Sequence, residues 1–252
     1  MTSALVLAGT RPGGDPLAGA EGKPHKALIE IEGRPLLERV VSALHAAGIE
    51  RIGVSCDEGP VADLARKCGC EVLRTGAGPS ESASIGFAAL GAPLVITTAD
   101  HALLQPDWVR TLIEGTPGDS DLGVGLARRE DVEAAMPGSR RTYLRLADGA
   151  WSGCNLFYLR TPAAEAALST WRGVEADRKR PWRIAGRLGL GTLLSYAFGR
   201  LTLADAISRL GKRMRVEARL VRLHDGLAAV DVDKPQDLDD IRAILSRKPR
   251  SR

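Results

Sequence analysis

The first hundred residues alternate short apolar segments with longer helix-like ones, and this alternation restricts the fold more than any other feature of the chain. Short apolar runs bounded by turn residues predict strands at 3–8, 50–56, 70–75 and 92–100. The intervening segments 35–48, 60–69 and 80–91 are predicted helices; in the first, Leu37, Val40, Val41 and Leu44 recur at helical spacing. Strands joined by such helices form βαβ crossovers, which predicts an α/β fold with a mostly parallel sheet flanked by helices.

The second half of the sequence is less regular. Further strands, including an antiparallel one, are predicted at 120–129, 142–149 and 153–160. A helix follows at 161–171, with Thr161 as its expected cap, and residues from about 174 to 214 are expected to form a helical insertion. The remaining predicted elements are strands 217–223 and 227–232 and helix 235–245. Because the chain has no internal repeat and no linker, residues 1–252 are expected to form a single domain with a basic tail at 247–252.

The composition argues against several classes of protein. No apolar run is long enough to span a bilayer, and Ala4–Ala8 is too short for a signal peptide, so a cytoplasmic protein without stable membrane insertion is expected. The four cysteines lack metal-finger spacing, which predicts free thiols. A net charge of +4 suits small phosphorylated ligands, and because only 4% of residues are aromatic, no nucleic-acid partner is expected. The sequence leaves a homodimer open.

A glycine-rich, basic loop follows the first strand. Gly9, Gly13 and Gly14 place flexible backbone just beyond the carboxyl end of this strand, where open parallel sheets bind ligands and where backbone amides can surround phosphate oxygens. The cationic side chains of the loop are those of Arg11, Lys23 and Lys26. The loop matches neither a Walker loop nor the GxGxxG fingerprint. These residues alone therefore leave two interpretations open, a phosphate-binding loop and a solvent-exposed loop with incidental charges.

The segment "LVLAGT", the basic loop and "KPHKALIEIEGRPLLERVV" together resemble the opening of the MobA-like NTP transferases, which include the molybdenum cofactor guanylyltransferase and related nucleotidyltransferases. The resemblance implies a Rossmann-like, GT-A-like fold of the nucleotide-diphospho-sugar transferases. It implies that Arg11 and Lys26 are catalytic cations, which offset charge on the transferred and leaving phosphates. The nucleotide-binding residues that it implies in the loop are Ala8, Gly9, Thr10 and Gly13. In this chain Thr10 stands where the family has a second glycine, and the loop is longer and contains proline.

The same resemblance extends to two aspartates that are far apart in the sequence. The segment "VITTADHALL" ends a strand at Asp100, and "AVDVDKPQDLDDI" is similar to the late "VDTPEDL" segment of the family, so the resemblance implies that Asp100 and Asp233 are Mg²⁺ ligands. Mg²⁺ prefers oxygen and is usually held by one or two carboxylates plus substrate phosphates. Helix capping is the alternative role for both residues, and Asp231 is an alternative ligand. His101, next to Asp100, is assigned no role.

Three further motifs each have two interpretations. Ser82 and Gly86 match the "SVxxG" turn with which some relatives approach the nucleotide, although local capping at a helix N-terminus would explain the serine equally well. Asn155 is assigned to the acceptor pocket because it and Gly153 interrupt an apolar strand. In the helical insertion, Arg178 and Arg180 are assigned to the phosphate of the acceptor, because arginine binds phosphate oxygens bidentately. An ordinary core strand and a solvated charged turn are the respective alternatives.

These residues together predict a Mg²⁺-dependent nucleotidyltransferase of the guanylyl- or cytidylyltransferase type. A phosphorylated small-molecule acceptor would attack the α-phosphorus of an NTP, and pyrophosphate would leave. Two other functions stay open. A glycosyltransferase of the same fold usually carries Asp-x-Asp at a strand end, whereas "TTADHA" offers one aspartate. A non-catalytic nucleotide-binding module would bind NTP without turnover against any phosphorylated acceptor.

Overall fold

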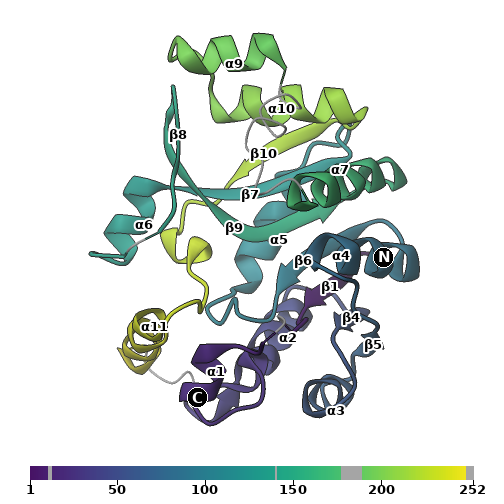
Figure 1. The fold of residues 1–252 in the computed structure, drawn as a ribbon, viewed down its shortest axis with the longest axis vertical. Coiled ribbons are helices and arrows are strands. Elements are labelled where there is room, and N and C mark those ends of the chain that lie inside the picture. The colour runs from purple at the N-terminus through teal and green to yellow at the C-terminus, as the bar shows by residue number, and fades with distance from the viewer. Residues whose placement is uncertain (11–12, 140, 177–188, 248–252) are drawn as a thin grey trace.

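The computed structural model describes residues 1–10, 13–139, 141–176 and 189–247 (Figure 1). In the first half, the predicted strands and helices occur in the predicted order, and four further short elements form at 16–35, where the sequence predicts a loop. The elements there are β1 (Ser3–Leu7), α1 (Pro16–Ala20), the 3-10 turn η1 (Lys26–Leu28), β2 (Glu30–Ile31), β3 (Arg34–Pro35), α2 (Leu36–Ala46), β4 (Ile52–Ser55), α3 (Pro60–Lys67), β5 (Glu71–Leu73), α4 (Pro79–Leu90) and β6 (Leu94–Thr98).

In the second half, strands and helices follow a less regular order. The elements there are α5 (Pro106–Glu114), β7 (Leu122–Arg128), α6 (Arg129–Ala135), β8 (Leu144–Leu146), β9 (Gly149–Leu159), η2 (Pro162–Ala164), α7 (Glu165–Ala176), α9 (Leu190–Ala197), α10 (Leu203–Met214), β10 (Ala218–Arg222), η3 (Gly226–Ala229) and α11 (Pro235–Arg247). No helix of the described ranges has both the length and the apolar character that crossing a membrane requires.

Eight strands of the described chain form one sheet, in the order β10-β7-β9-β6-β1-β4-β5, with β8 paired to β9. The central strand β1 is parallel to β4 and β6, β4 is parallel to β5, and β10 is parallel to β7. The strand β9 is antiparallel to β6, β7 and β8. The predicted α/β fold, with its mostly parallel sheet and an antiparallel strand, is confirmed.

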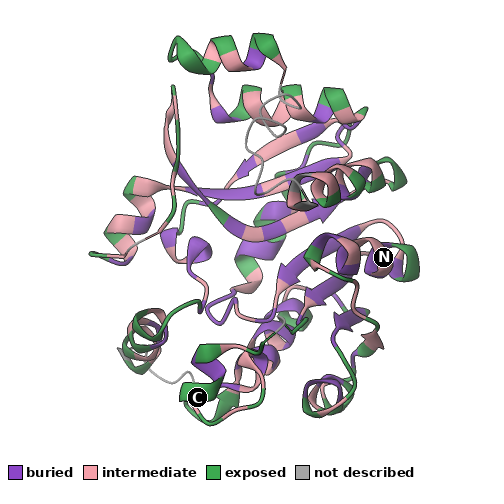
Figure 2. Cartoon of the chain, in the orientation of Figure 1, coloured by how far each residue is buried: buried purple, intermediate pink, exposed green. Residues whose placement is uncertain are grey.

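Different helices cover the two faces of the sheet. Along β1, Ala4 and Val6 belong to one hydrophobic core and Leu5 to another, the period of two that a strand buried on both faces requires. The first core includes side chains of α2, α5 and α11, and the second includes side chains of α4 and α7. Figure 2 shows the buried residues along the sheet and the exposed ones on the outer sides of the helices. Because β1 and β6 are parallel, with Leu7 opposite Thr98, their carboxyl ends lie side by side.

Gly86 allows α4 to pack closely on β1, because a Cβ at this position would lie within 3.0 Å of three side-chain carbons of Leu5. The substitution Gly86→Ala is therefore expected to lower the free energy of unfolding by about 1–3 kcal/mol through overpacking, measured by urea denaturation. Gly191→Ala in α9 is the matched control, since a Cβ there has no neighbour within 4 Å among the atoms described, and it is expected to lose no stability. Equal stability of the Gly86→Ala variant and the wild type would contradict this packing.

The prediction of a strand at 227–232 is wrong. The carboxylate of Asp225 accepts a hydrogen bond from the Leu227 N–H at 3.0 Å and starts the 3-10 turn η3, so the backbone turns where a strand would extend. After this turn, the Val232 N–H donates to the carbonyl oxygen of Asp100 at 3.0 Å. That bond holds the segment between η3 and α11 against the loop that follows β6.

The expected cap at Thr161 is confirmed in position, since Thr161 is the N-cap residue of η2, but its side chain makes no capping hydrogen bond. Thr161 precedes the 3-10 turn η2, but its hydroxyl donates to the carboxylate of Asp121, and α7 begins only at Glu165. The predicted helical insertion is helical in its described part, which comprises the end of α7, α9 and α10. Residues 177–188 lie outside the described residues.

Candidate active site

A cleft of about 1340 Å³ opens at the carboxyl ends of β1 and β6. Its walls come from the loop after β1, the turn before α4, the loop after β6, strand β9, helix α7 and the segment before α11. Open parallel sheets bind ligands at this edge. Segments that are far apart in the sequence therefore meet in one cleft.

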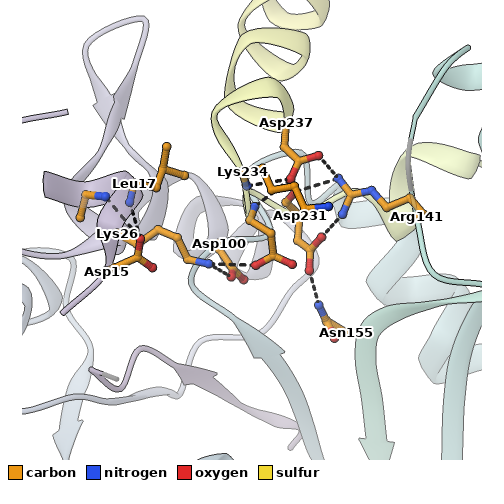
Figure 3. A network of polar contacts seen from close by, with 11 residues as sticks. Asp15, Leu17, Lys26, Asp100, Arg141, Asn155, Asp231, Lys234 and Asp237 are labelled. Atoms are coloured by element: carbon orange, nitrogen blue, oxygen red, sulfur yellow. Dashed lines mark hydrogen bonds and ion pairs between the residues drawn. The ribbon is translucent and has the colours of Figure 1, made fainter. Parts of the chain in front are cut away.

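Lys26 begins the short turn η1, and its side chain extends into the cleft. The turn is capped by His25, whose Nδ1 accepts a hydrogen bond from the Ala27 N–H at 3.0 Å. The ammonium nitrogen of Lys26 lies 2.6 Å from Asp100 Oδ2 and 3.2 Å from Asp233 Oδ1 (Figure 3). Burial lowers the pKa of Lys26, but the two carboxylates outweigh this effect and raise the pKa above its usual value. Lys26 therefore stays charged.

Three carboxylates converge beside Lys26. Asp100, Asp231 and Asp233 each offer one oxygen, and these three oxygens lie within 4.8 Å of one another. Burial raises the pKa of Asp100, yet the charge and hydrogen bond of Lys26 hold it below its usual value, so Asp100 is ionised. Asp100 Oδ1 is buried and has no hydrogen-bond partner among the described residues. A hard divalent cation such as Mg²⁺ fits this oxygen donor set, and it would give the unpartnered oxygen a ligand.

Two side chains hold Asp231 from the side opposite Lys26 (Figure 3). Arg141 Nη1 donates to the carboxylate of Asp231, and Arg141 Nη2 donates to its carbonyl oxygen at 2.9 Å. Asn155 Nδ2 donates to Asp231 Oδ2 at 2.8 Å. Burial, followed by the charges of Asp233 and Asp100, raises the pKa of Asp231 to about 6. The paired arginine and amide thus keep a crowded carboxylate in a fixed orientation.

Asp237 fixes the start of α11. Its Oδ2 accepts hydrogen bonds from the backbone N–H groups of Asp233 and Lys234, at 3.1 and 2.9 Å, and its Oδ1 accepts one from Arg141 Nη2 at 3.1 Å. Asp237 therefore performs the capping that the sequence left open for Asp233. The carboxylate of Asp233 turns instead to Lys26.

Asn155 has an unusual backbone conformation, with a φ of 48°. It lies in β9, opposite the point where the pairing with β7 shifts register between Gly125 and Leu126. Such an irregularity redirects a side chain out of the regular alternation, and asparagine tolerates the left-handed region better than most residues do. The strand thereby turns the amide of Asn155 toward Asp231.

This conformation gives a prediction that separates the backbone of Asn155 from its side chain. Asn155→Gly and Asn155→Ala both remove the amide that donates to Asp231, but only glycine accepts a positive φ freely. The glycine variant is expected to be more stable than the alanine variant by about 1 kcal/mol in urea denaturation. An alanine variant as stable as the glycine variant would mean that the positive φ carries no strain.

The other predicted site residues are placed as follows. Ala8, Gly9 and Thr10 line the cleft, as does Ser82, whose hydroxyl accepts a hydrogen bond from the Gly76 N–H at 2.9 Å. That bond agrees with a local structural role for Ser82, although the residue also lines the cleft.

Gly13 is exposed with a φ of 92° and does not belong to the described lining. Arg11, Arg178 and Arg180 lie outside the described residues.

The structure also adds residues that the sequence did not indicate. Phe157 and Trp171 line the cleft with their ring centroids 6.3 Å apart, and Arg172 and Glu175 extend this wall along α7. Glu175 Oε2 accepts hydrogen bonds from the N–H and the hydroxyl of Ser80 at the start of α4. In the sequence Trp171, Arg172 and Glu175 belong to an ordinary helix and Phe157 to an ordinary apolar strand, so no local pattern marks them as site residues. His101, to which no role is assigned, is buried and stacks on Trp108.

Comparisons with known proteins identify a family and proteins of similar fold. The family model described as the MobA-like NTP transferase domain matches residues 4–178. A 3-deoxy-manno-octulosonate cytidylyltransferase from Anaeromyxobacter sp. is 26% identical over 245 residues, which cover 92% of this chain and 95% of that protein. A hypothetical transferase from Thermus thermophilus superimposes with a TM-score of 0.80 and 33% identity over 94% of this chain and 99% of that one. A 4-diphosphocytidyl-2C-methyl-D-erythritol synthase superimposes with a TM-score of 0.61 and 16% identity over 97% of each chain, a likeness of fold.

Proposed function

Because this chain belongs to the MobA-like NTP transferase family, we propose that it transfers a nucleotidyl group from an NTP to a small anionic acceptor in a Mg²⁺-dependent reaction. The observation that carries the proposal is the convergence of Lys26 with Asp100, Asp231 and Asp233 in the cleft that the loop after β1 lines. We propose CTP as the donor, since the relative that matches 92% of the chain is named a cytidylyltransferase.

In the proposed reaction an ionised acceptor oxygen attacks the α-phosphorus of the nucleotide. A new bond between phosphorus and the acceptor oxygen forms, and the bond from the α-phosphorus to the oxygen bridging to the β-phosphorus breaks, so that pyrophosphate leaves with that electron pair. A phosphorylated acceptor is already ionised near neutral pH, so the reaction requires no general base. Catalysis then depends on alignment and on neutralising charge.

The chain's own residues supply the positioning and part of the charge. Lys26, with its raised pKa, offers a permanent cation to the phosphates. Asp100 and Asp233 would hold the Mg²⁺, with Asp231 as a third carboxylate beside them. The bound ion would neutralise phosphate oxygens as a Lewis acid. The catalytic role of Arg11 stays a prediction from the family resemblance.

We propose that the acceptor lies against the wall formed by β9 and α7. Phe157 and Trp171 offer an apolar surface there, and Arg172 adds a cation on the same wall. This combination suits a small molecule with an apolar face and an anionic group. A phosphorylated small molecule is the proposed class, and a sugar acid, the acceptor in the name of the Anaeromyxobacter protein, is the second class to test.

The proposal is tested by pyrophosphate release from purified protein with Mg²⁺. CTP, GTP, ATP and UTP are each combined with a panel of phosphorylated sugars and polyols and a panel of sugar acids. Pyrophosphate is expected to form in amounts equal to the nucleotide-linked product, fastest with CTP. Binding of NTP without product from any acceptor would support the non-catalytic module instead.

A further inference from the structure

Lys26 occupies the position in the cleft that a metal ion would be expected to take. Its ammonium lies between the carboxylates of Asp100 and Asp233, at 2.6 and 3.2 Å, and only 13% of its side chain is exposed. On the other side, Asp231 is already paired with Arg141. Lys26 is thus the cation that keeps Asp100 and Asp233 together in the described structure.

An ammonium and a divalent ion cannot both stay on these carboxylates at low cost. Mg²⁺ binds oxygen at about 2.0–2.1 Å. An ion bound to Asp100 would therefore share one carboxylate group with the ammonium of Lys26, which lies 2.6 Å from Asp100 Oδ2. Repulsion between like charges this close is strong in a partly buried cleft. Free metal must therefore displace Lys26, and without nucleotide the displaced ammonium loses its two anionic partners.

A nucleotide changes this balance, because its phosphates give the ammonium new anionic partners. The lysine side chain has a flexible four-carbon stem, while the backbone of Lys26 is fixed by the cap that His25 forms on η1. The ammonium can therefore move from the carboxylates to the phosphates without any rearrangement of the backbone.

We propose that Lys26 is a resident counter-cation that keeps free divalent metal out of the site and leaves the carboxylates when metal arrives together with the nucleotide. The inference rests on the proposed function for the identity of the nucleotide, but the exclusion of free metal by Lys26 is a property of the protein alone. The exclusion by Lys26 couples the binding of metal to the binding of nucleotide, so that metal binds tightly only when a triphosphate is present.

The test measures Mn²⁺ binding by electron paramagnetic resonance, without nucleotide, in wild-type protein and in the variants Lys26→Met and Lys26→Arg. The methionine variant has lost the competing cation and is expected to bind Mn²⁺ at least about tenfold more tightly than the wild type. The arginine variant keeps a cation in place and is expected to bind Mn²⁺ as weakly as the wild type. Lys23→Met, which removes a lysine paired with Glu30 instead, is the control and should leave Mn²⁺ affinity unchanged.

Thermal melting gives a second readout if Lys26→Met is unstable without metal. Two unpaired carboxylates should lower its melting temperature in EDTA, and Mn²⁺ should raise that temperature more than it does in the wild type. Unchanged or weaker Mn²⁺ binding by Lys26→Met, or no rescue of its melting temperature, would overturn the inference. If those metal results contradict the inference but the wild-type protein turns over CTP, only the inference has failed. If the metal results agree with the inference but the wild-type protein turns over no NTP, only the proposed function has failed.

Discussion

Replacing Asp100 with asparagine is expected to lower kcat for pyrophosphate release by at least about a thousandfold, because the loss of a metal ligand removes several kcal/mol of transition-state stabilisation. Asparagine keeps the shape of the side chain, but it removes the charge and replaces one carboxylate oxygen with an amide nitrogen. Lys26 keeps Asp233 as an ion-pair partner in this variant, so the fold is expected to survive. Turnover is measured with CTP, Mg²⁺ and the acceptor that the screen identifies, and folding by circular dichroism and thermal melting.

Asp63→Asn is the matched control for this change. Asp63 lies on α3 with 66% of its side chain exposed, it lies 3.7 Å from Arg66, and it is not among the residues that line the cleft. Its removal is expected to leave both kcat and KM at wild-type values. If a folded Asp100→Asn variant retained wild-type turnover, Asp100 would have no part in holding the metal, and the assignment of the site would be wrong.

The order of strands and helices in the first half could be predicted because local patterns there agree with the tertiary fold. In β1 and β4 no residue is charged and all but Leu7 are buried, which is the pattern of a strand covered on both faces. The segment at 227–232 has a similarly apolar sequence but forms η3 and an unpaired stretch. Its conformation is decided by the cap from Asp225 and by the bond from Val232 to Asp100, two interactions that hydrophobic periodicity does not encode.

The site likewise contains residues that sequence motifs indicate and residues that only the folded chain reveals. Lys26, Asp100 and Asp233 were indicated by motifs, and the structure brings them together although the sequence separates them widely. Arg141 gave no local signal, because its partner Asp231 is 90 residues away and only the folded chain joins them. Asn155 was assigned to the acceptor because it interrupts an apolar strand. In the structure, the pairing of β9 with β7 shifts register at this interruption, and the amide of Asn155 turns toward Asp231. The sequence pattern therefore indicates the position of Asn155, whereas its contact with Asp231 depends on the fold.

Arg141→Met is expected to produce the largest loss of stability among these substitutions. Only 9% of the Arg141 side chain is exposed, and its guanidinium pairs with the carboxylates of both Asp231 and Asp237. Removing it leaves two mostly buried carboxylates without their cation, which typically costs about 3–5 kcal/mol. The free energy of unfolding is measured by urea denaturation near neutral pH. Arg66→Met is the control, because Arg66 is exposed and pairs with the exposed Glu58. This substitution is expected to change stability little.

The cost of Arg141→Met should depend on pH in a defined direction. Asp231 already has its pKa raised to about 6, chiefly by burial, and losing the guanidinium would raise it further. A carboxyl group whose pKa is higher in the folded than in the unfolded state destabilises the fold when ionised, and this penalty disappears as the pH falls below the folded-state pKa. The stability difference between wild type and Arg141→Met is therefore expected to be smaller at about pH 5 than at about pH 7.5. Adding Asp231→Asn to the variant should recover part of the loss at the higher pH. A loss that is the same at both pH values, with no recovery in the double variant, would show that Arg141 stabilises the chain by packing rather than by pairing with Asp231.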